Sequence, residues 1–269
     1  MTHERSIVHY MGVRIDNINY QDIRDTVVCT LRHNGRGYIC VNDVGNLIEA
    51  AKDTMLLNAI NSSLMTIADG VPLAWYAKIA GCTRIKRISG MDLMVNMFSE
   101  NNGYKHYLLG DTEIRIRRVM EKAKRINGNI NIDGHSPPFT EFDASDNAVM
   151  ADKLNRARPD IIWVSFGGGK QDKWMCENIN RIDRGVMIGV GAAFKWFVGD
   201  LKVPPVILQK MGLQWIFRIA CSLMEDPVKN LDFVVTRVLK RRLIFVLNFP
   251  GEVVRARRAC TEKRCGKFQ

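Results

Sequence analysis

Asp69 is the residue of this sequence best placed to do chemistry. It follows the apolar run LMTIA directly and precedes Gly70. A carboxylate at the carboxyl end of a strand borders the ligand crevice of an α/β sheet, where a general base must lie. Asp-Gly is also a common turn pair, so a purely structural role stays open.

A second candidate lies in the stretch PDIIWVSFGGGKQDKW, residues 159–174. Its apolar run ends in three glycines, a lysine and a glutamine: Gly167, Gly168, Gly169, Lys170 and Gln171. Glycines let a ligand approach the main chain, and the free N–H groups of a following helix favour an anion such as a diphosphate. Glycines after a strand also serve turns alone, and the segment by itself leaves both interpretations open.

Four other apolar runs end in residues that could face the same crevice. These residues are Asn42 and Asp43, Gly110, His135 and Gly191. His135 is open to three interpretations: a polar loop residue, a proton-transfer group or a phosphate contact. The segment GVGAAF resembles a dinucleotide fingerprint, but Phe194 replaces the third glycine, which argues against NAD.

Strands and helices alternate along the part of the chain that must position these residues. The strand-like runs are YICVN, LMTIADG, HYLLGD, NINIDGH, DIIWVSFGGG and GVMIGVGAAF. Helical patterns between them cover 45–63, 72–81, 113–126 and 146–157, and a further helix is expected from residue 171. This alternation predicts a doubly wound, Rossmann-like, mostly parallel sheet. Strands that are apolar throughout are expected to be buried on both faces.

The net charge of +11 is uneven along the 269 residues. Residues 1–200 hold 25 Lys/Arg and 23 Asp/Glu, whereas residues 201–269 hold 14 and 5. We therefore expect an α/β catalytic body at 1–200 and a basic, amphipathic, helical appendage at 201–269. Aromatic residues among its cations suggest docking on an anionic membrane surface. Alternatively, the aromatics pack on the body and the cations are solvated.

Cysteine usage and the first residues favour a reducing compartment. The seven cysteines include no C-x-x-C pair, and the start MTHERSIVHYMG lacks the apolar core of a signal peptide. We expect a cytoplasmic protein. The sequence also lacks a D-x-D element or a His/Cys cluster, so no metal cofactor is expected.

Seven ordered segments together resemble the WecG/TagA/CpsF family of bacterial glycosyltransferases over approximately residues 7–230. They are ADGVPLAW, RISGMDLM, HYLLGD, DGHSPPF, PDIIWVSFGGGKQDKW, GVGAAFKWFVG and LQKMGLQWIFR. The resemblance implies an inverting transfer from a UDP-sugar to a polyprenyl-diphosphate-linked acceptor during synthesis of a surface polysaccharide or wall polymer. It also implies a peripheral position on the inner face of the cell membrane.

The resemblance further implies roles for single residues. Asp69 matches the proposed general base, and Gln171 matches a residue that lines the pocket. Lys170 and the adjacent glycines are expected to face the nucleotide or its diphosphate. Arg218 is the candidate for a diphosphate contact. Three residues match the element R-[VI]-[TS]-G-x-D-L, which is expected in the same pocket: Arg87, Gly90 and Asp92.

The chain departs from the family pattern at several positions, and two of these departures bear on donor or acceptor contacts. Val41-Asn42-Asp43 stands where many members have T-x-N, and Lys195 stands where members often have an acid. A donor that bears a carboxylate would be compatible with Lys195. In the appendage, four cations are expected to meet lipid headgroups: Arg237, Lys240, Arg241 and Arg242.

Two other classes of protein remain possible on the sequence alone. A non-catalytic nucleotide-binding regulator would keep the glycine-rich loop, and a nucleic-acid-binding protein would use the basic tail. Neither accounts for the ordered set of segments. We therefore expect a UDP-sugar, a lipid-linked glycan and an anionic membrane as partners, and no nucleic acid. A homo-oligomer is left open.

Overall fold

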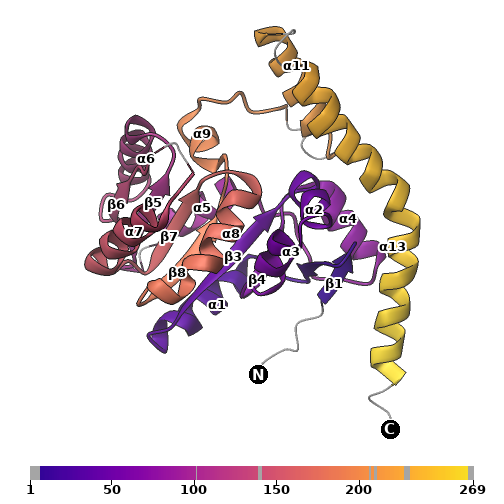
Figure 1. The fold of residues 1–269 in the computed structure, drawn as a ribbon, viewed down its shortest axis with the longest axis horizontal. Helices are drawn as coiled ribbons and strands as arrows, with labels where there is room; N and C mark the ends of the chain where they lie inside the picture. The colour runs from indigo at the N-terminus through magenta and orange to yellow at the C-terminus, as the bar shows by residue number, and fades with distance from the viewer. Residues whose placement is uncertain are drawn as a thin grey trace.

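A six-stranded parallel sheet forms the centre of the molecule, in the order β4-β3-β8-β7-β5-β6 (Figure 1). The computed structural model describes residues 7–100, 102–138, 141–205, 207–208, 211–226 and 231–265. The strands of the sheet are β3 (Arg36–Asn42), β4 (Met65–Ala68), β5 (Lys105–Gly110), β6 (Asn131–His135), β7 (Ile161–Ser165) and β8 (Gly185–Gly189). The predicted doubly wound α/β architecture is confirmed.

Helices cover both faces of this sheet, so successive strand residues enter two different cores. In β7, Ile161 and Trp163 face one core, whereas Ile162 and Val164 face the other. The first of these cores is covered by α1 (Tyr20–Arg32), α5 (Gly90–Ser99), α6 (Glu113–Ile126) and α9 (Ala193–Val198). The second is covered by α2 (Val44–Ala50), α3 (Thr54–Asn61), α4 (Val71–Ile79), α7 (Ala144–Ala157) and α8 (Gly168–Asn178). A short helix, η1 (Ile179–Arg181), follows α8. Burial on both faces explains the continuous apolar character of the strands.

Several elements differ from the sequence expectation. The helix expected at 45–63 is divided into α2, which ends at Ala50, and α3, which Asp53 caps by accepting a hydrogen bond from Leu56 N at 3.0 Å. Helix α8 begins at Gly168, not at Gln171. The periodic patterns also did not reveal α1, α5 or the antiparallel hairpin of β1 (Ile7–Tyr10) and β2 (Val13–Asp16).

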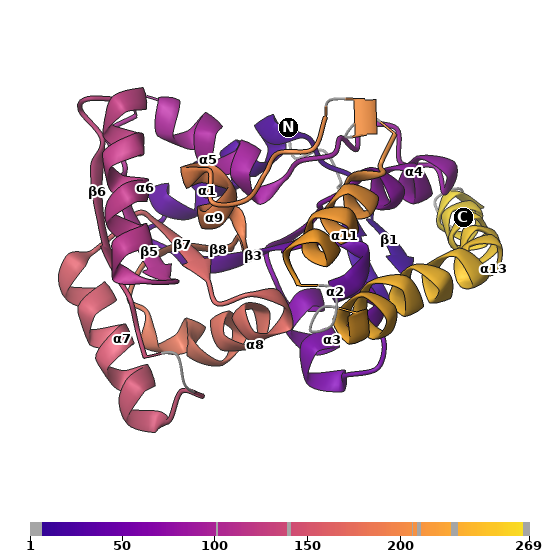
Figure 2. The same ribbon diagram turned by 90° about the horizontal axis from the view of Figure 1, so that it is seen from above.

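The C-terminal part forms α11 (Gln214–Glu225), the π-helical η2 (Phe233–Leu239) and α13 (Lys240–Cys265). Helix α13 runs along the side of the body that carries β1, α2 and α4 (Figures 1 and 2). Tyr10 Oη donates to the carbonyl of Phe245 at 2.5 Å, and Met11 N donates to Glu252 Oε2 at 2.9 Å. These contacts join the two ends of the chain.

The strand order determines which strand ends can share a site. From β3 the sheet continues to β4 on one side and to β8, β7, β5 and β6 on the other. The carboxyl ends of β4, β3, β8 and β7 are therefore neighbours, while those of β5 and β6 lie farther out. Such a switch point is where open α/β sheets bind ligands.

Candidate active site

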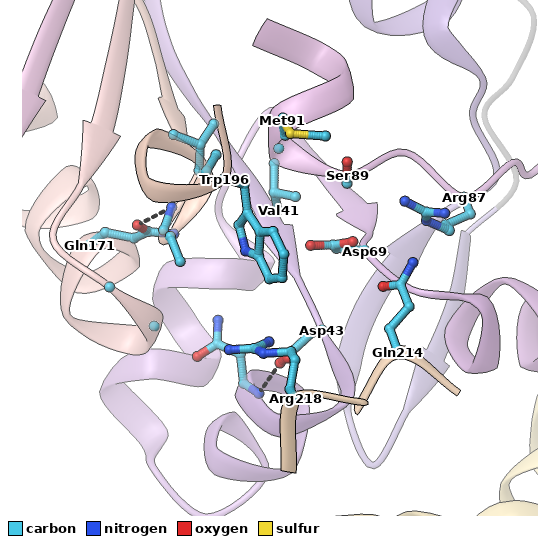
Figure 3. A pocket seen from close by; sticks show the side chains of 18 of the residues that line it. Val41, Asp43, Asp69, Arg87, Ser89, Met91, Gln171, Trp196, Gln214 and Arg218 are labelled. Carbon is cyan, nitrogen blue, oxygen red and sulfur yellow. Dashed lines mark hydrogen bonds between the residues drawn. The ribbon is translucent and has the colours of Figure 1, made fainter. Parts of the chain in front are cut away.

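A cavity of about 310 Å³ opens at the carboxyl ends of β3, β4, β7 and β8 (Figure 3). It brings together nine of the residues that the sequence analysis selected: Asp43, Asp69, Arg87, Gly90, Gly167, Gly168, Gln171, Gly191 and Arg218. They come from segments that are up to 175 residues apart along the chain. The crevice expected from the strand ends is therefore present.

The carboxyl group of Asp69 lies in the wall of this cavity (Figure 3). Its main-chain N–H donates to the carbonyl of Asn42 at 2.9 Å, which continues the pairing of β3 with β4 and fixes the backbone. Burial raises the pKa of Asp69 to about 7, and the nearby Asp43 carboxylate adds to the rise. Arg87 and Arg218 oppose it. A carboxyl group that titrates near neutral pH is suited to exchange a proton with a ligand.

Asp92 holds two of the lining residues in place. Its Oδ2 accepts hydrogen bonds from Ser89 Oγ at 2.7 Å and from Arg87 Nη2 at 3.3 Å. Ser89 in turn caps α5 by accepting from Asp92 N at 3.1 Å. Asp92 itself does not line the cavity. At Gly90 a Cβ atom would lie 3.0 Å from the carbonyl of Val190, so glycine allows α5 to approach the end of β8.

Gln171 connects α8 to the turn after β8. Its Oε1 accepts from Gly191 N at 2.9 Å (Figure 3), and its side chain is almost fully buried. Gly167 and Gly168 form the turn into α8 with φ angles of +85° and +42°, which side chains with a Cβ rarely adopt. The glutamine and the two glycines thus shape one wall of the cavity.

Four of the selected residues lie at strand ends and are not among the residues that line this cavity. Asn42 is completely buried behind the wall, and Gly70 starts α4 with a φ of 112°. At Gly110 a Cβ atom would lie 2.5 Å from the carbonyl of Ser165, so this glycine permits close packing of β5 on β7. His135 lies at the edge strand β6 with its Nε2 3.0 Å from Lys153 Nζ, and burial together with Lys153 lowers its pKa.

A second cavity of about 730 Å³ adjoins the first, between the N-terminal ends of α2 and α8 and the C-terminal helices. Six residues line both cavities: Asp43, Asn46, Gly167, Gly168, Trp196 and Arg218. Gly169 and Lys170 belong to the second cavity alone. Lys170 Nζ lies 4.2 Å from the centroid of the Phe142 ring. The glycine-rich loop therefore separates the two spaces.

The C-terminal arginines face the body. Arg218 lies over the Trp196 ring, with its Cζ 5.9 Å from the ring centroid. Arg242 lies over the Trp215 ring, with its Cζ 5.8 Å from the ring centroid. Both arginines line the second cavity, and burial lowers the pKa of Arg242. Arg241 Nη2 pairs with Glu49 Oε2 at 2.8 Å.

The expectation that Arg241 and Arg242 face lipid headgroups is therefore wrong. The end of the chain folds back on the body, which turns these two arginines toward α2 and the second cavity. Lys240 is exposed, and the side chain of Arg237 lies outside the described residues. Lys195 is exposed and lines neither cavity, so it provides no support for a carboxylate-bearing donor.

Several lining residues were not among the candidates chosen from the sequence: Asn46, Ser89, Trp196 and Gln214. Arg242 was a candidate for a lipid contact, but it lines the second cavity. Asn46 had a usable signal, because Asp43 is a favoured N-cap residue and the side chain of a cap bonds the main chain three residues further on. Trp196 and Gln214 lie within segments that carry the family resemblance, but nothing local distinguishes them from packing residues.

Neither a metal-binding cluster nor a membrane-spanning helix is found in the described parts of the chain. Within the described ranges, no three His, Cys, Asp or Glu side chains gather where they could hold a metal ion. No helix in the described part of the chain combines the length and apolar character that a membrane span requires.

A doubly wound sheet with a carboxylate and arginines around a cavity at its switch point defines an α/β protein whose site suits an anionic, nucleotide-like ligand. The family model described as "Glycosyl transferase WecG/TagA/CpsF family" matches residues 8–253. The chain belongs to this family.

Relatives of this chain carry the description N-acetylglucosaminyldiphosphoundecaprenol N-acetyl-beta-D-mannosaminyltransferase. One from Bacillus subtilis (strain 168) is 26% identical over 172 residues, which cover 63% of this chain and 66% of the relative. One from Staphylococcus aureus (strain NCTC 8325 / PS 47) is 28% identical over 164 residues, or 60% and 63% of the two chains. The aligned segments thus span just under two thirds of these relatives.

Proposed function

We propose that this chain is an inverting glycosyltransferase that moves a sugar from a UDP-sugar to a polyprenyl-diphosphate-linked acceptor in bacterial surface-polysaccharide or wall-polymer synthesis. The observation that carries the proposal is the carboxyl group of Asp69. It lies in the cavity at the strand ends with a pKa of about 7, between Arg87 and Arg218. Family membership and the descriptions of the relatives support the same reaction.

In this reaction Asp69 takes the proton of the acceptor hydroxyl. The acceptor oxygen forms a bond to the anomeric carbon as the bond from that carbon to UDP breaks, and UDP leaves with the electron pair. Attack from the face opposite UDP inverts the anomeric centre. A base with a pKa near the working pH is both deprotonated in part and strong enough to accept this proton.

The two adjoining cavities suit the two substrates of such a transfer. The first cavity, bordered by Asp69 and the Gly167–Gly168 turn, is assigned to the UDP-sugar. The second, lined by aromatic residues of the C-terminal helices, is assigned to the head of the lipid-linked acceptor. Arg218 borders both and can stabilise the developing charge on a diphosphate.

The C-terminal helices are assigned to the membrane surface. Several of their apolar side chains are exposed: Ile216, Met224, Val235, Leu239, Leu243, Val246 and Leu247. Exposed apolar side chains beside basic residues suit a peripheral helix on an anionic leaflet. An acceptor anchored in the membrane would then reach the second cavity without leaving the bilayer.

The proposal is tested with purified protein, a panel of UDP-sugars and a short-chain N-acetylglucosaminyl diphosphopolyprenol as acceptor. We expect a glycosylated lipid in mass spectrometry and inversion at the anomeric carbon in NMR spectra. We also expect full activity in EDTA, since arginines instead of a divalent cation would face the leaving diphosphate. Absence of product with every donor, from folded protein that binds UDP, would contradict the transferase assignment, and activity restored only by Mg²⁺ or Mn²⁺ would contradict the metal-free mechanism.

A further inference from the structure

Three buried polar side chains lie together behind the wall shared by the two cavities. Asn42 ends β3, Asn46 lies on α2, and Asp172 lies on α8. Asn42 and Asp172 are completely buried, and Asn46 is 7% exposed. Polar groups this deeply buried need hydrogen-bond partners, because otherwise their loss of water is not compensated.

The amide nitrogen of Asn46 gives one hydrogen bond to each of the other two side chains. Asn46 Nδ2 donates to Asp172 Oδ2 at 2.8 Å and to Asn42 Oδ1. An amide nitrogen has two hydrogens, so both donors of this side chain are used. Turning the amide over would place its oxygen against two other oxygens. The Asp172 carboxylate, which only accepts hydrogen bonds when ionised, therefore fixes the orientation of the Asn46 amide.

The carbonyl oxygen of Asn46 is left without a protein partner. Asn46 Oδ1 is buried and has no hydrogen-bond partner among the described residues. It lies 4.0 Å from the point that a Cβ atom on Gly168 would occupy, beside the glycine turn, and Asn46 lines both cavities. The Asn46 side chain thus has an unpartnered acceptor buried beside the glycine turn that borders both cavities, and no free donor.

We propose that Asn46 is a specificity-determining residue that accepts a hydrogen bond from a hydroxyl or amide N–H of the transferred sugar. Asp172 is its positioning residue. This inference rests on the proposed function. It assigns Asn46 to the sugar because the transferred group must lie where the donor space meets the acceptor space, and Asn46 borders both.

The test measures dissociation constants for UDP and for a UDP-sugar by calorimetry. UDP-N-acetylglucosamine, UDP-glucose and UDP-glucuronic acid are compared on the wild-type protein, and the tightest is used with the variants. We expect Asn46→Ala to weaken this UDP-sugar about tenfold, which corresponds to one lost hydrogen bond, and to change UDP binding less than about twofold. Asn178→Ala is the matched control, because Asn178 is a buried amide that bonds within α8 and lines neither cavity.

A reciprocal exchange tests the positioning role of Asp172. Asn46→Asp alone places two carboxyl groups together and should weaken the UDP-sugar at least about tenfold. Adding Asp172→Asn restores an amide–carboxylate pair and still presents an oxygen to the cavity. The double variant should therefore recover binding to within about threefold of wild type. A merely structural role would not produce this recovery together with unchanged UDP binding.

The outcomes separate this inference from the proposed function. Equal loss of UDP and UDP-sugar binding in Asn46→Ala, no loss of either, or a double variant no better than Asn46→Asp would overturn the role of Asn46 while leaving the transferase assignment intact. Failure of the wild-type protein to bind any UDP-sugar would overturn both. Melting temperatures of all variants show which of them are folded.

Discussion

Two aspartates near the crevice have similar pKa values but different surroundings. Burial raises the pKa of both Asp69 and Asp172 to about 7. Asp172 is closed off behind Asn46, whereas Asp69 borders the cavity beside Arg87. Only Asp69 can therefore meet a substrate hydroxyl, and the chemistry at this scale depends on access as much as on pKa.

Replacing Asp69 by asparagine should abolish transfer while leaving the fold and UDP binding intact. The amide retains the size of the carboxyl group but cannot take up the acceptor proton, and a general base contributes about 10²- to 10⁴-fold to the rate. Initial rates with the lipid-linked acceptor and calorimetry with UDP provide the two measurements. Turnover within about tenfold of wild type would show that Asp69 is not the base.

The rate of transfer should rise with pH through the pKa of Asp69. The deprotonated carboxylate is the active form, so kcat/KM should increase about tenfold between pH 6 and pH 8 around a midpoint near 7. Asp172→Asn is the control, because it removes the other carboxyl group of similar pKa. If the midpoint near pH 7 disappears in this variant, the titration belongs to Asp172. If kcat/KM of the wild type does not change with pH, neither carboxyl group controls the rate.

At the scale of elements, the glycines that follow the strands have separate tasks. Gly167 and Gly168 shape the turn before α8, whereas Gly169 allows α8 to contact Leu56, since a Cβ there would lie 2.6 Å from Leu56 Cδ2. Gly110 serves the packing of two strands. Position after a strand is therefore not sufficient to make a glycine a ligand contact.

Gly110→Ala should destabilise the fold more than a change at a glycine with open space. Both Gly110 and Gly199 have positive φ angles, of 118° and 86°, but only at Gly110 would a Cβ meet a backbone atom, Ser165 O at 2.5 Å. We expect a loss of more than about 2 kcal/mol of unfolding free energy for Gly110→Ala and about 1 kcal/mol for Gly199→Ala. Urea denaturation of both variants measures the difference. Equal losses would show that the strands adjust to the added methyl group.

At the scale of the whole molecule, the C-terminal part completes the second cavity and also presents an apolar surface. Helix α13 packs on the hairpin and on α2, with Phe245 buried against Tyr10. Deleting the appendage would therefore expose part of the core and disturb the body itself. Point changes on its outer face provide a cleaner test of membrane binding.

Changing Val246 and Leu247 to glutamate should weaken binding to anionic vesicles about tenfold or more. These side chains are 64% and 70% exposed, and the double change removes apolar contact and adds negative charge facing an anionic surface. Co-sedimentation with phosphatidylglycerol vesicles measures the effect. Ile114→Glu, at a 73% exposed position on α6, is the matched control. Equal sedimentation of the double variant and the wild type would reject this face as the membrane contact.

The sequence alone determined the alternation of strands and helices, because the periodicity of apolar residues reflects burial of each local segment. It also identified Asp69, Arg87 and Gln171, since position after a strand and the ordered family segments are properties of the chain itself. Residues 201–269 were recognisable as different from their charge and aromatic content.

The tertiary structure decided which of these residues meet. Strand order is a set of long-range pairings that local patterns do not contain, and it places Gly110 and His135 away from the cavity that Asp69 borders. The approach of α8 to α2 brings Asp172 to Asn46, across 126 positions of sequence. The return of α13 to the hairpin turns Arg242 inward, because burying Phe245 against Tyr10 fixes which side of that helix faces the body.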